Sequence, residues 1–127
     1  MAVQLEVLAD QFAVCRFAPQ TEITDLIPSA GFFALTRTAD ELSLVVSESA
    51  LGTGWQAERG WRALKVLGPL DFSLVGVLAA LAAPLAEAGI SIFAISTYDT
   101  DYLLVKKDKL AAAVAALATA GFVIGGG

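Results

Sequence analysis

The sequence predicts an α+β fold made of two modules, of which the second is complete and the first is a shortened copy. From Trp61 onward, β-prone segments and alanine-rich helical segments follow one another in the order βαββαβ. The first half of the chain contains β-prone segments but little that is helical. A shift of 60 positions, without a gap, aligns residues 32–36 with 92–96 and residues 42–45 with 102–105, which indicates an internal duplication.

Composition and charge narrow the class of protein before any motif is considered. With 57% hydrophobic and 17% charged residues in 127, the chain has enough apolar surface to fold as one compact domain or as two very small modules sharing a core. Its net charge of −5 offers no basic patch for nucleic acid or for an anionic membrane surface. The absence of histidine removes the side chain most used for proton transfer, which argues against an enzyme. We therefore expect a small molecule or a protein as partner, and no cofactor.

The pattern of apolar residues predicts neither a membrane segment nor a secretory signal. The longest apolar stretch, residues 74–86, is shorter than the roughly 20 residues that cross a bilayer. Residues 1–9 contain Glu6 and have no basic segment ahead of an apolar core. Because Cys15 is the only cysteine, no internal disulfide can form, and its apolar neighbours predict a buried, inert thiol. A cytoplasmic protein is the default expectation.

The first module, residues 1–60, is predicted to consist of strands with little helix. Strands are expected at residues 11–17, 32–36 and 42–47. The last two would form a hairpin, joined by the polar residues 37–41. Residues 20–30 are turn-like or hold one short helical turn. The glycines and charged residues of 48–60 indicate a linker that ends near Gly60.

The second module is predicted to hold four strands and two helices. It spans residues 61–127, with strands at 61–67, 92–97, 102–106 and 122–124 and helices at 73–88 and 109–120. Ser73 and Asp108 can cap the starts of the two helices. Gly89 and Gly121 can end them in the left-handed conformation. Pro84 removes one amide from the first helix, which predicts a kink without a break.

Two segments of the second module resemble a known family. They are residues 68–73 with Gly76 after them, and residues 89–105, in which Ser96-Thr97-Tyr98 and Asp101 are the most specific part. Both resemble the small bacterial ACT-domain proteins, whose C-terminal module is similar to the ligand-binding modules of the cytosolic arginine sensors of animals. The resemblance covers residues 61–124 closely and the first half more loosely. It implies a ferredoxin-like ACT domain at 61–127, with a truncated ACT-like module at 1–60 packed on it.

The resemblance also implies where a ligand would lie. In that family a free amino acid sits between the turn that opens the first helix and the strand end that follows. The matching positions on the helix side are Asp71, Phe72, Ser73, Leu74 and Gly76, and those on the strand side are Thr97, Tyr98 and Asp101. Members that bind a basic amino acid place a carboxylate near the position of Leu74, so the resemblance implies the class of the ligand and not its identity.

The chemistry of these positions suits a zwitterion. Free amides at a helix start can hold an α-carboxylate, and Asp101 can pair with an α-ammonium group while Thr97 adds one hydrogen bond. Simpler roles stay open. Gly76, expected inside the helix, can serve helix packing, and Asp101 can be a solvated residue at a strand end. Asp71 can be a helix-start residue favoured by the dipole.

Other acidic and aromatic residues lead to simpler expectations. The spacing of Asp71, Asp99 and Asp101 matches no known metal-binding loop, so we expect no metal. Trp55 and Trp61 flank the predicted linker and are expected to anchor one module to the other.

The function that these observations favour is a non-enzymatic regulatory module that binds a free amino acid. Ligand would stabilise one arrangement of the protein, and a protein partner would respond to that arrangement. The alternative is a structural or oligomerisation protein that keeps the fold without a ligand, since open strand edges favour pairing between chains. A homodimer is expected.

Overall fold

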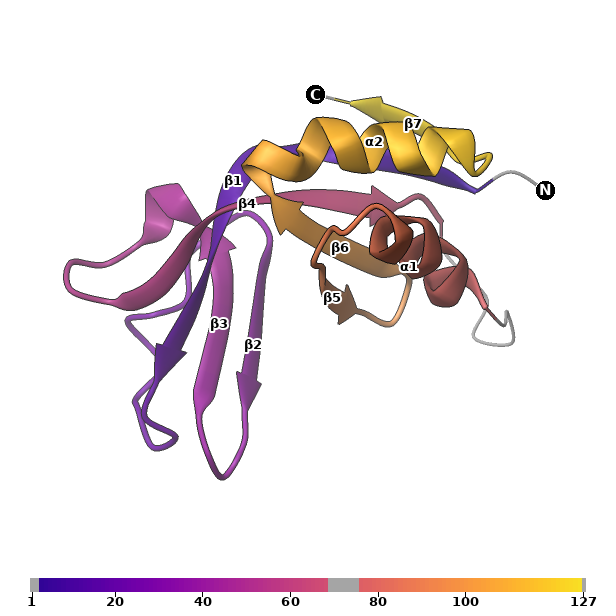
Figure 1. Cartoon of the computed structure of the whole chain (residues 1–127). Coiled ribbons are helices and arrows are strands. Elements are labelled where there is room, and N and C mark those ends of the chain that lie inside the picture. The colour runs from indigo at the N-terminus through magenta and orange to yellow at the C-terminus, as the bar shows by residue number, and fades with distance from the viewer. Residues whose placement is uncertain (1–2, 69–75, 127) are drawn as a thin grey trace. The chain divides into compact units, whose positions relative to one another are not determined.

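The computed structural model describes residues 3–68 and 76–126, and it divides the chain into two compact units (Figure 1). The middle unit is residues 10–60, and the terminal unit is residues 1–9 together with 61–127. The elements are β1 (Gln4–Phe17), β2 (Phe33–Arg37), β3 (Leu42–Ser47), η1 (Glu48–Ala50), β4 (Gln56–Val66), α1 (Val77–Glu87), β5 (Phe93–Ser96), β6 (Asp101–Lys106), η2 (Lys107–Lys109), α2 (Leu110–Thr119) and β7 (Val123–Gly126). The long strands β1 and β4 each contribute residues to both units.

The terminal unit contains the predicted βαββαβ order, in β4, α1, β5, β6, α2 and β7. It also contains a strand that was not predicted, because β1 begins at Gln4 and not at residue 11. This first part of β1 pairs in parallel with β7, placing Leu5 opposite Ile124, and lies beside β4 in the sheet. The first nine residues were expected in the first module. They belong to the other unit because their strand pairs there.

One face of the terminal unit's sheet packs against both helices. Along β4, Leu64 and Val66 point to this face, and Lys65 between them points to the other, because side chains alternate along a strand. The buried residues of this core are Leu5, Val7, Leu64, Val66, Leu81, Leu85, Ile90, Leu103, Val105, Ala113 and Leu117. Neither helix of the described residues is long and apolar enough to span a membrane.

Both helices end as predicted, at Gly89 and Gly121. These glycines have φ of 74° and 102°, the left-handed region that a side chain disfavours. In each case the amide of the next residue donates to a carbonyl five positions back, which is the Schellman arrangement. These bonds run from Ile90 N to Leu85 O at 2.9 Å and from Phe122 N to Leu117 O at 3.1 Å. The apolar residue after each glycine packs on the core.

The helix starts differ from the predictions. α1 begins at Val77, four residues later than expected, and Gly76 precedes it with φ of 85°. Gly76 therefore does not lie inside the helix, and Ser73 lies outside the described residues. The predicted cap by Asp108 is wrong: the N-cap of α2 is Lys109, with no side-chain cap. Because Lys109 already has helical backbone angles after the turn η2, no extended N-cap is left for a side chain to serve.

Pro84 lies inside α1 as predicted, and the helix continues past it to Glu87. Its carbonyl accepts a hydrogen bond from Ala88 N at 3.1 Å.

The middle unit contains β2, β3 and parts of β1 and β4, and it has its own core. β3 pairs with β2 on one side and with residues 12–17 of β1 on the other. Trp55 packs into this core, with its ring 5.2 Å from that of Phe17. Cys15 is buried there, and burial raises the pKa of its thiol although Arg59 acts in the opposite direction. The predicted linker is shorter than expected, since β4 already begins at Gln56.

Each unit contains a hairpin of the same construction, β2–β3 in one and β5–β6 in the other (Figure 1). Four residues connect the strands in both, 38–41 and 97–100. β3 and β6 begin at positions 42 and 101, and the turns η1 and η2 begin at 48 and 107. The structural offset of the repeat is therefore 59 residues, one fewer than the predicted 60.

Candidate functional site

The strand-side positions of the predicted site lie at the turn of the β5–β6 hairpin. Thr97 N donates to Thr100 O at 2.8 Å, and the Thr97 hydroxyl donates to the same carbonyl at 3.0 Å. The Thr97 hydroxyl also accepts from Thr100 N at 3.2 Å. Thr38 and Glu41 make the same three bonds in the middle unit. The bonds of Thr97 are thus part of a repeated turn, which leaves its hydroxyl one free lone pair.

Thr100 ties this turn to the end of β4. Its side chain is 5% exposed, and its hydroxyl donates to Val66 O at 2.6 Å. The matching position in the middle unit is Glu41, so this bond is particular to the terminal unit. The end of the hairpin is therefore fixed on the neighbouring strand by a buried hydrogen bond.

Asp101 is held within the hairpin. The Ser96 hydroxyl donates to Asp101 Oδ1 at 2.6 Å, and the two residues lie opposite each other in register. The repeat has Arg37 and Leu42 at these positions, so the pair arose in only one of the two hairpins.

A cavity of about 210 Å³ opens beside this turn. It is lined by Lys65, Gly68, Thr97, Asp99, Thr100 and Tyr102. Lys65 and Tyr102 are directly paired in β4 and β6, and Lys65 Nζ lies 6.0 Å from the centre of the Tyr102 ring. Their neighbours Leu64 and Leu103 point into the helix-covered core. Because side chains alternate along a strand, the cavity lies on the sheet face opposite the helices.

The cavity lining carries one positive and one negative group, from Lys65 and Asp99. Within residues 3–68 and 76–126, the structure gives neither group a hydrogen bond or an ion pair from its side chain. Hydroxyls of Thr97, Thr100 and Tyr102 complete the polar lining. A ligand with both an anionic and a cationic group would meet an opposite charge for each.

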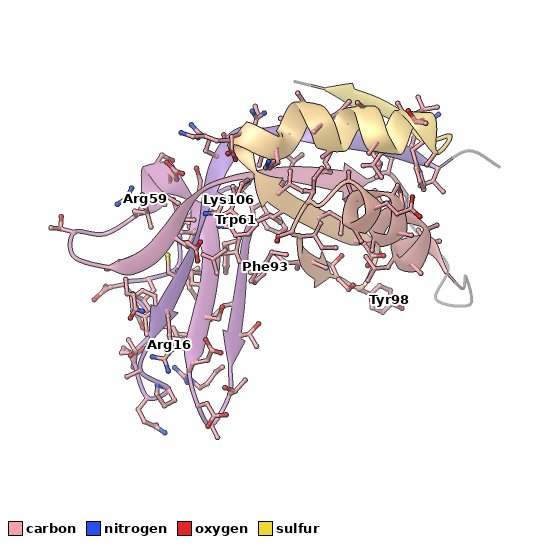
Figure 2. All side chains as sticks on the ribbon, viewed as in Figure 1. Arg16, Arg59, Trp61, Phe93, Tyr98 and Lys106 are labelled. Atoms are coloured by element: carbon pink, nitrogen blue, oxygen red, sulfur yellow. The ribbon has the colours of Figure 1, made fainter. Side chains whose placement is uncertain are left out.

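The predicted site residues are distributed unevenly around this cavity. Thr97 lines it, whereas Asp101 does not and is bonded to Ser96 instead. Tyr98 is 79% exposed at the hairpin end, where Figure 2 shows its ring away from the sheet. Gly76 precedes α1. Asp71, Phe72, Ser73 and Leu74 lie outside the described residues.

Thr97 is the one described lining residue that was predicted for the site. Lys65 is the cationic residue among those that the sequence reasoning missed. Its signal was the alternation along residues 61–66, where Leu64 and Val66 are core positions and Lys65 is a charge on the other face. Asp99 was considered as a turn residue and as a metal ligand, but not as a contact for an amino acid. Both belong to segments that the sequence analysis assigned correctly as strand and turn.

Further along the same face of the terminal unit lies an aromatic and cationic group. Lys106 Nζ is 4.6 Å from the centre of the Trp61 ring, whose ring lies 6.2 Å from that of Phe93 (Figure 2). Trp61 and Lys106 are paired directly across β4 and β6. These residues do not line the cavity.

Sequence comparison identifies the family to which this fold belongs. The family model described as the ACT domain matches residues 56–119, and a second model, described as an N-terminal domain, matches residues 10–52. The chain belongs to the ACT-domain family, and the predicted resemblance is confirmed. Its fold is an ACT-type α+β fold.

Among curated relatives, the human protein CASTOR3P is 35% identical over 92 residues, which cover 62% of this chain and 56% of that protein. The bovine cytosolic arginine sensor for mTORC1 subunit 1 is 30% identical over 102 residues, covering 68% of this chain and 30% of the sensor. The chain thus spans just over half of the first relative and under a third of the second.

Solved structures show the same architecture along the whole chain. Protein Atu0741 of Agobacterium tumefaciens is 31% identical, with a TM-score of 0.93 and coverage of 100% of this chain and 95% of that one. The regulatory subunit of aspartate kinase from Thermus thermophilus has a TM-score of 0.68 at 13% identity, covering 94% and 99%. At that identity the second likeness concerns the fold alone.

Proposed function

We propose that this chain is a non-catalytic regulatory module that binds a free amino acid in its terminal unit, beside the turn of the β5–β6 hairpin. The observation that carries the proposal is the small polar cavity at this turn, whose described lining includes a cation, Lys65, and an anion, Asp99. Membership of the ACT-domain family supports it, as does the similarity to proteins named cytosolic arginine sensors.

The size and chemistry of the cavity suit a small zwitterion. Its 210 Å³ is several times the roughly 30 Å³ of a water molecule and below the about 300–1,000 Å³ of pockets for drug-sized ligands. An α-carboxylate and an α-ammonium group would each find an opposite charge in the lining. The hydroxyls of the lining would complete the contacts.

The proposed ligand contacts include the positions that the family resemblance implies. They are Asp71, Phe72, Ser73, Leu74 and Gly76 before α1, and Thr97, Tyr98 and Asp101 at the hairpin. The proposal extends to a ferredoxin-like arrangement of β4, α1, β5, β6, α2 and β7 into which the first part of β1 is inserted. It also includes a cytosolic location, a homodimer and a protein partner.

Regulation would follow from differential binding. A ligand shifts an equilibrium between two arrangements only by its difference in affinity for them, and a partner that recognises one arrangement then responds. Catalysis is not part of the proposal because the chain has no histidine and the hydroxyls of Thr97 and Thr100 already donate within the turn and to β4.

A thermal-shift screen of the twenty amino acids tests the proposal. A ligand at 100 times its Kd adds about 2.7 kcal/mol to the free energy of unfolding, which raises the Tm by several degrees. We expect Asp99→Asn to reduce that shift and Asp40→Asn to leave it unchanged. Asp40 is the matched control because it occupies the same turn position in the middle unit. Absence of a shift with every amino acid would count decisively against ligand binding.

A structural or oligomerisation protein is the second candidate. It is favoured by the internal bonds of the hairpin, since the hydroxyls of Thr97 and Thr100 already make contacts that a purely structural turn would need. This candidate predicts that Asp101→Ala alters neither stability nor assembly, and that sedimentation shows one oligomer whatever amino acid is added. A ligand-dependent change in sedimentation would reject it.

A further inference from the structure

We infer that Lys65 anchors the α-carboxylate of the ligand, and that the cavity therefore selects an amino acid with an uncharged side chain. This inference rests on the proposed function and specifies its ligand. It starts from a residue that neither the sequence reasoning nor the family resemblance brought to the site.

The position of Lys65 is fixed by the sheet. It lies one residue from the end of β4, directly paired with Tyr102 of β6, and its ammonium lies 6.0 Å from the centre of that ring. The aliphatic part of the side chain is thereby placed on the sheet surface, and the charged group reaches the cavity. Within the described ranges, 3–68 and 76–126, no carboxylate is paired with it.

The balance of charge among the described lining residues points to the class of ligand. Within residues 3–68 and 76–126, Asp99 is the acidic residue that lines the cavity, and Lys65 the basic one. An amino acid with an uncharged side chain satisfies both groups. A basic side chain would add a second cation to the ligand, but Asp99 already pairs with the α-ammonium group. An acidic side chain would add a second anion, but Lys65 already pairs with the α-carboxylate.

The same balance argues against a phosphorylated ligand. A phosphate monoester carries close to two negative charges at neutral pH, and one lysine beside an aspartate does not compensate them. The hydroxyl of Thr97 already donates to Thr100 O, and that of Thr100 to Val66 O, so they offer lone pairs and no free O–H to an anion.

Paired probes test this assignment by calorimetry on the full chain. The probes are L-alanine, L-leucine and L-methionine, each beside its amino alcohol, which keeps the ammonium group and side chain and lacks the carboxylate. We expect at least one of these amino acids to bind, and its amino alcohol to bind at least about 10-fold more weakly. L-Arginine and L-glutamate are expected to bind more weakly than the best neutral amino acid.

The variants are Lys65→Met and, as control, Lys106→Met. Both remove one positive charge from the same strand pair, but Lys106 does not line the cavity. We expect Lys65→Met to weaken the amino acid by about 10- to 100-fold and the amino alcohol by less than about 2-fold, whereas Lys106→Met changes neither. Circular dichroism and urea unfolding establish that both variants are folded.

The outcomes separate this inference from the proposed function. If the wild type binds no amino acid, both fail. Two results with a wild type that does bind would show that the carboxylate anchor is wrong while amino-acid binding stands. In one, Lys65→Met still binds the amino acid more tightly than its amino alcohol. In the other, Lys65→Met weakens the binding of both probes equally. Tighter binding of L-arginine or L-glutamate than of any neutral amino acid would overturn the selectivity.

Discussion

Thr100 is a buried polar residue whose single side-chain bond joins the hairpin to the adjacent strand. Valine has nearly the same shape but no hydroxyl, so Thr100→Val would leave Val66 O without its donor. A buried carbonyl without a partner costs about 1–3 kcal/mol. We expect the free energy of unfolding, measured with urea, to fall by that amount, and the amino-acid affinity to fall with it.

Thr38→Val is a solvent-exposed comparison for Thr100→Val, although Thr38 is the counterpart of Thr97 in the repeat. Thr38 opens the equivalent turn of the middle unit, but its bonds are exposed to solvent. Water can replace an exposed partner, so the loss should be smaller, near the about 0.5–1.5 kcal/mol of an ordinary hydrogen bond. Equal losses for the two variants would show that the buried position of Thr100 adds nothing.

At the scale of single residues, the sequence indicated the turn but not the groups that face the cavity. The polar residues between the strands predicted at 92–97 and 102–106 include Asp99 and Thr100, which are typical of a turn, and the side chain of Thr97 bonds to nearby backbone there. Which charged residue would face that turn depends on strand pairing, and Lys65 meets Tyr102 only once β4 and β6 are aligned. Local sequence contains no information on that alignment.

The way in which both helices end was predicted correctly, with a glycine in the left-handed conformation after each. Gly89→Ala should lower the free energy of unfolding by about 1–2 kcal/mol, because a side chain at φ of 74° is strained. Gly125→Ala is the control, since it lies outside the left-handed region and has open space around its Cβ position. Urea unfolding of the two variants should separate them. A Gly89→Ala variant as stable as Gly125→Ala would contradict the argument.

The starts of the helices and the register of the repeat were harder to predict. A shift of 60 aligns Phe33-Ala34 with Phe93-Ala94, whereas the structural shift of 59 aligns Thr38 with Thr97 and the buried residues 44–46 with 103–105. Apolar residues in neighbouring strand positions are chemically interchangeable, so they fix a register poorly. Turn residues fix it well, because their hydrogen bonds admit one position.

The whole molecule is organised so that the terminal unit needs both ends of the described chain. Leu5 and Val7 are 1% and 7% exposed in its core, and each contributes about 1.5–3 kcal/mol by burial. The free energy of unfolding of a typical domain is about 5–15 kcal/mol. Removing both side chains, together with the strand between β4 and β7, would therefore remove most of the stability of the terminal unit. We expect a fragment of residues 61–127 to be unfolded by circular dichroism.

Adding back the missing strand provides the control for that fragment. A peptide of residues 1–10 in excess should restore helical signal and cooperative unfolding, and the same peptide with Leu5→Ser should not. Cooperative unfolding of residues 61–127 alone, with the midpoint of the full chain, would show that this strand is dispensable. It would also support the simple division at position 60 that the sequence suggested.

The whole-molecule arrangement was the least predictable part of the fold. Residues 4–7 alternate polar and apolar side chains, which is a strand signal, but the pairing of Leu5 with Ile124 joins positions 119 residues apart. Contacts between residues so far apart in the sequence form only when the core is complete, so a short stretch of sequence does not indicate them. The βαββαβ order could be predicted because each of its elements has its own period and its own end signals.

The path of the chain also sets the order in which the two units can form on the ribosome. The middle unit has all of its residues by position 60, whereas the strand that begins at Gln4 must wait for β7, near the other end. At about 5–20 residues per second, that interval is roughly 6–24 s. During it, β4 is already available on one side of this strand, whereas the side that pairs with β7 stays open, so its edge is completed only when β7 has been made.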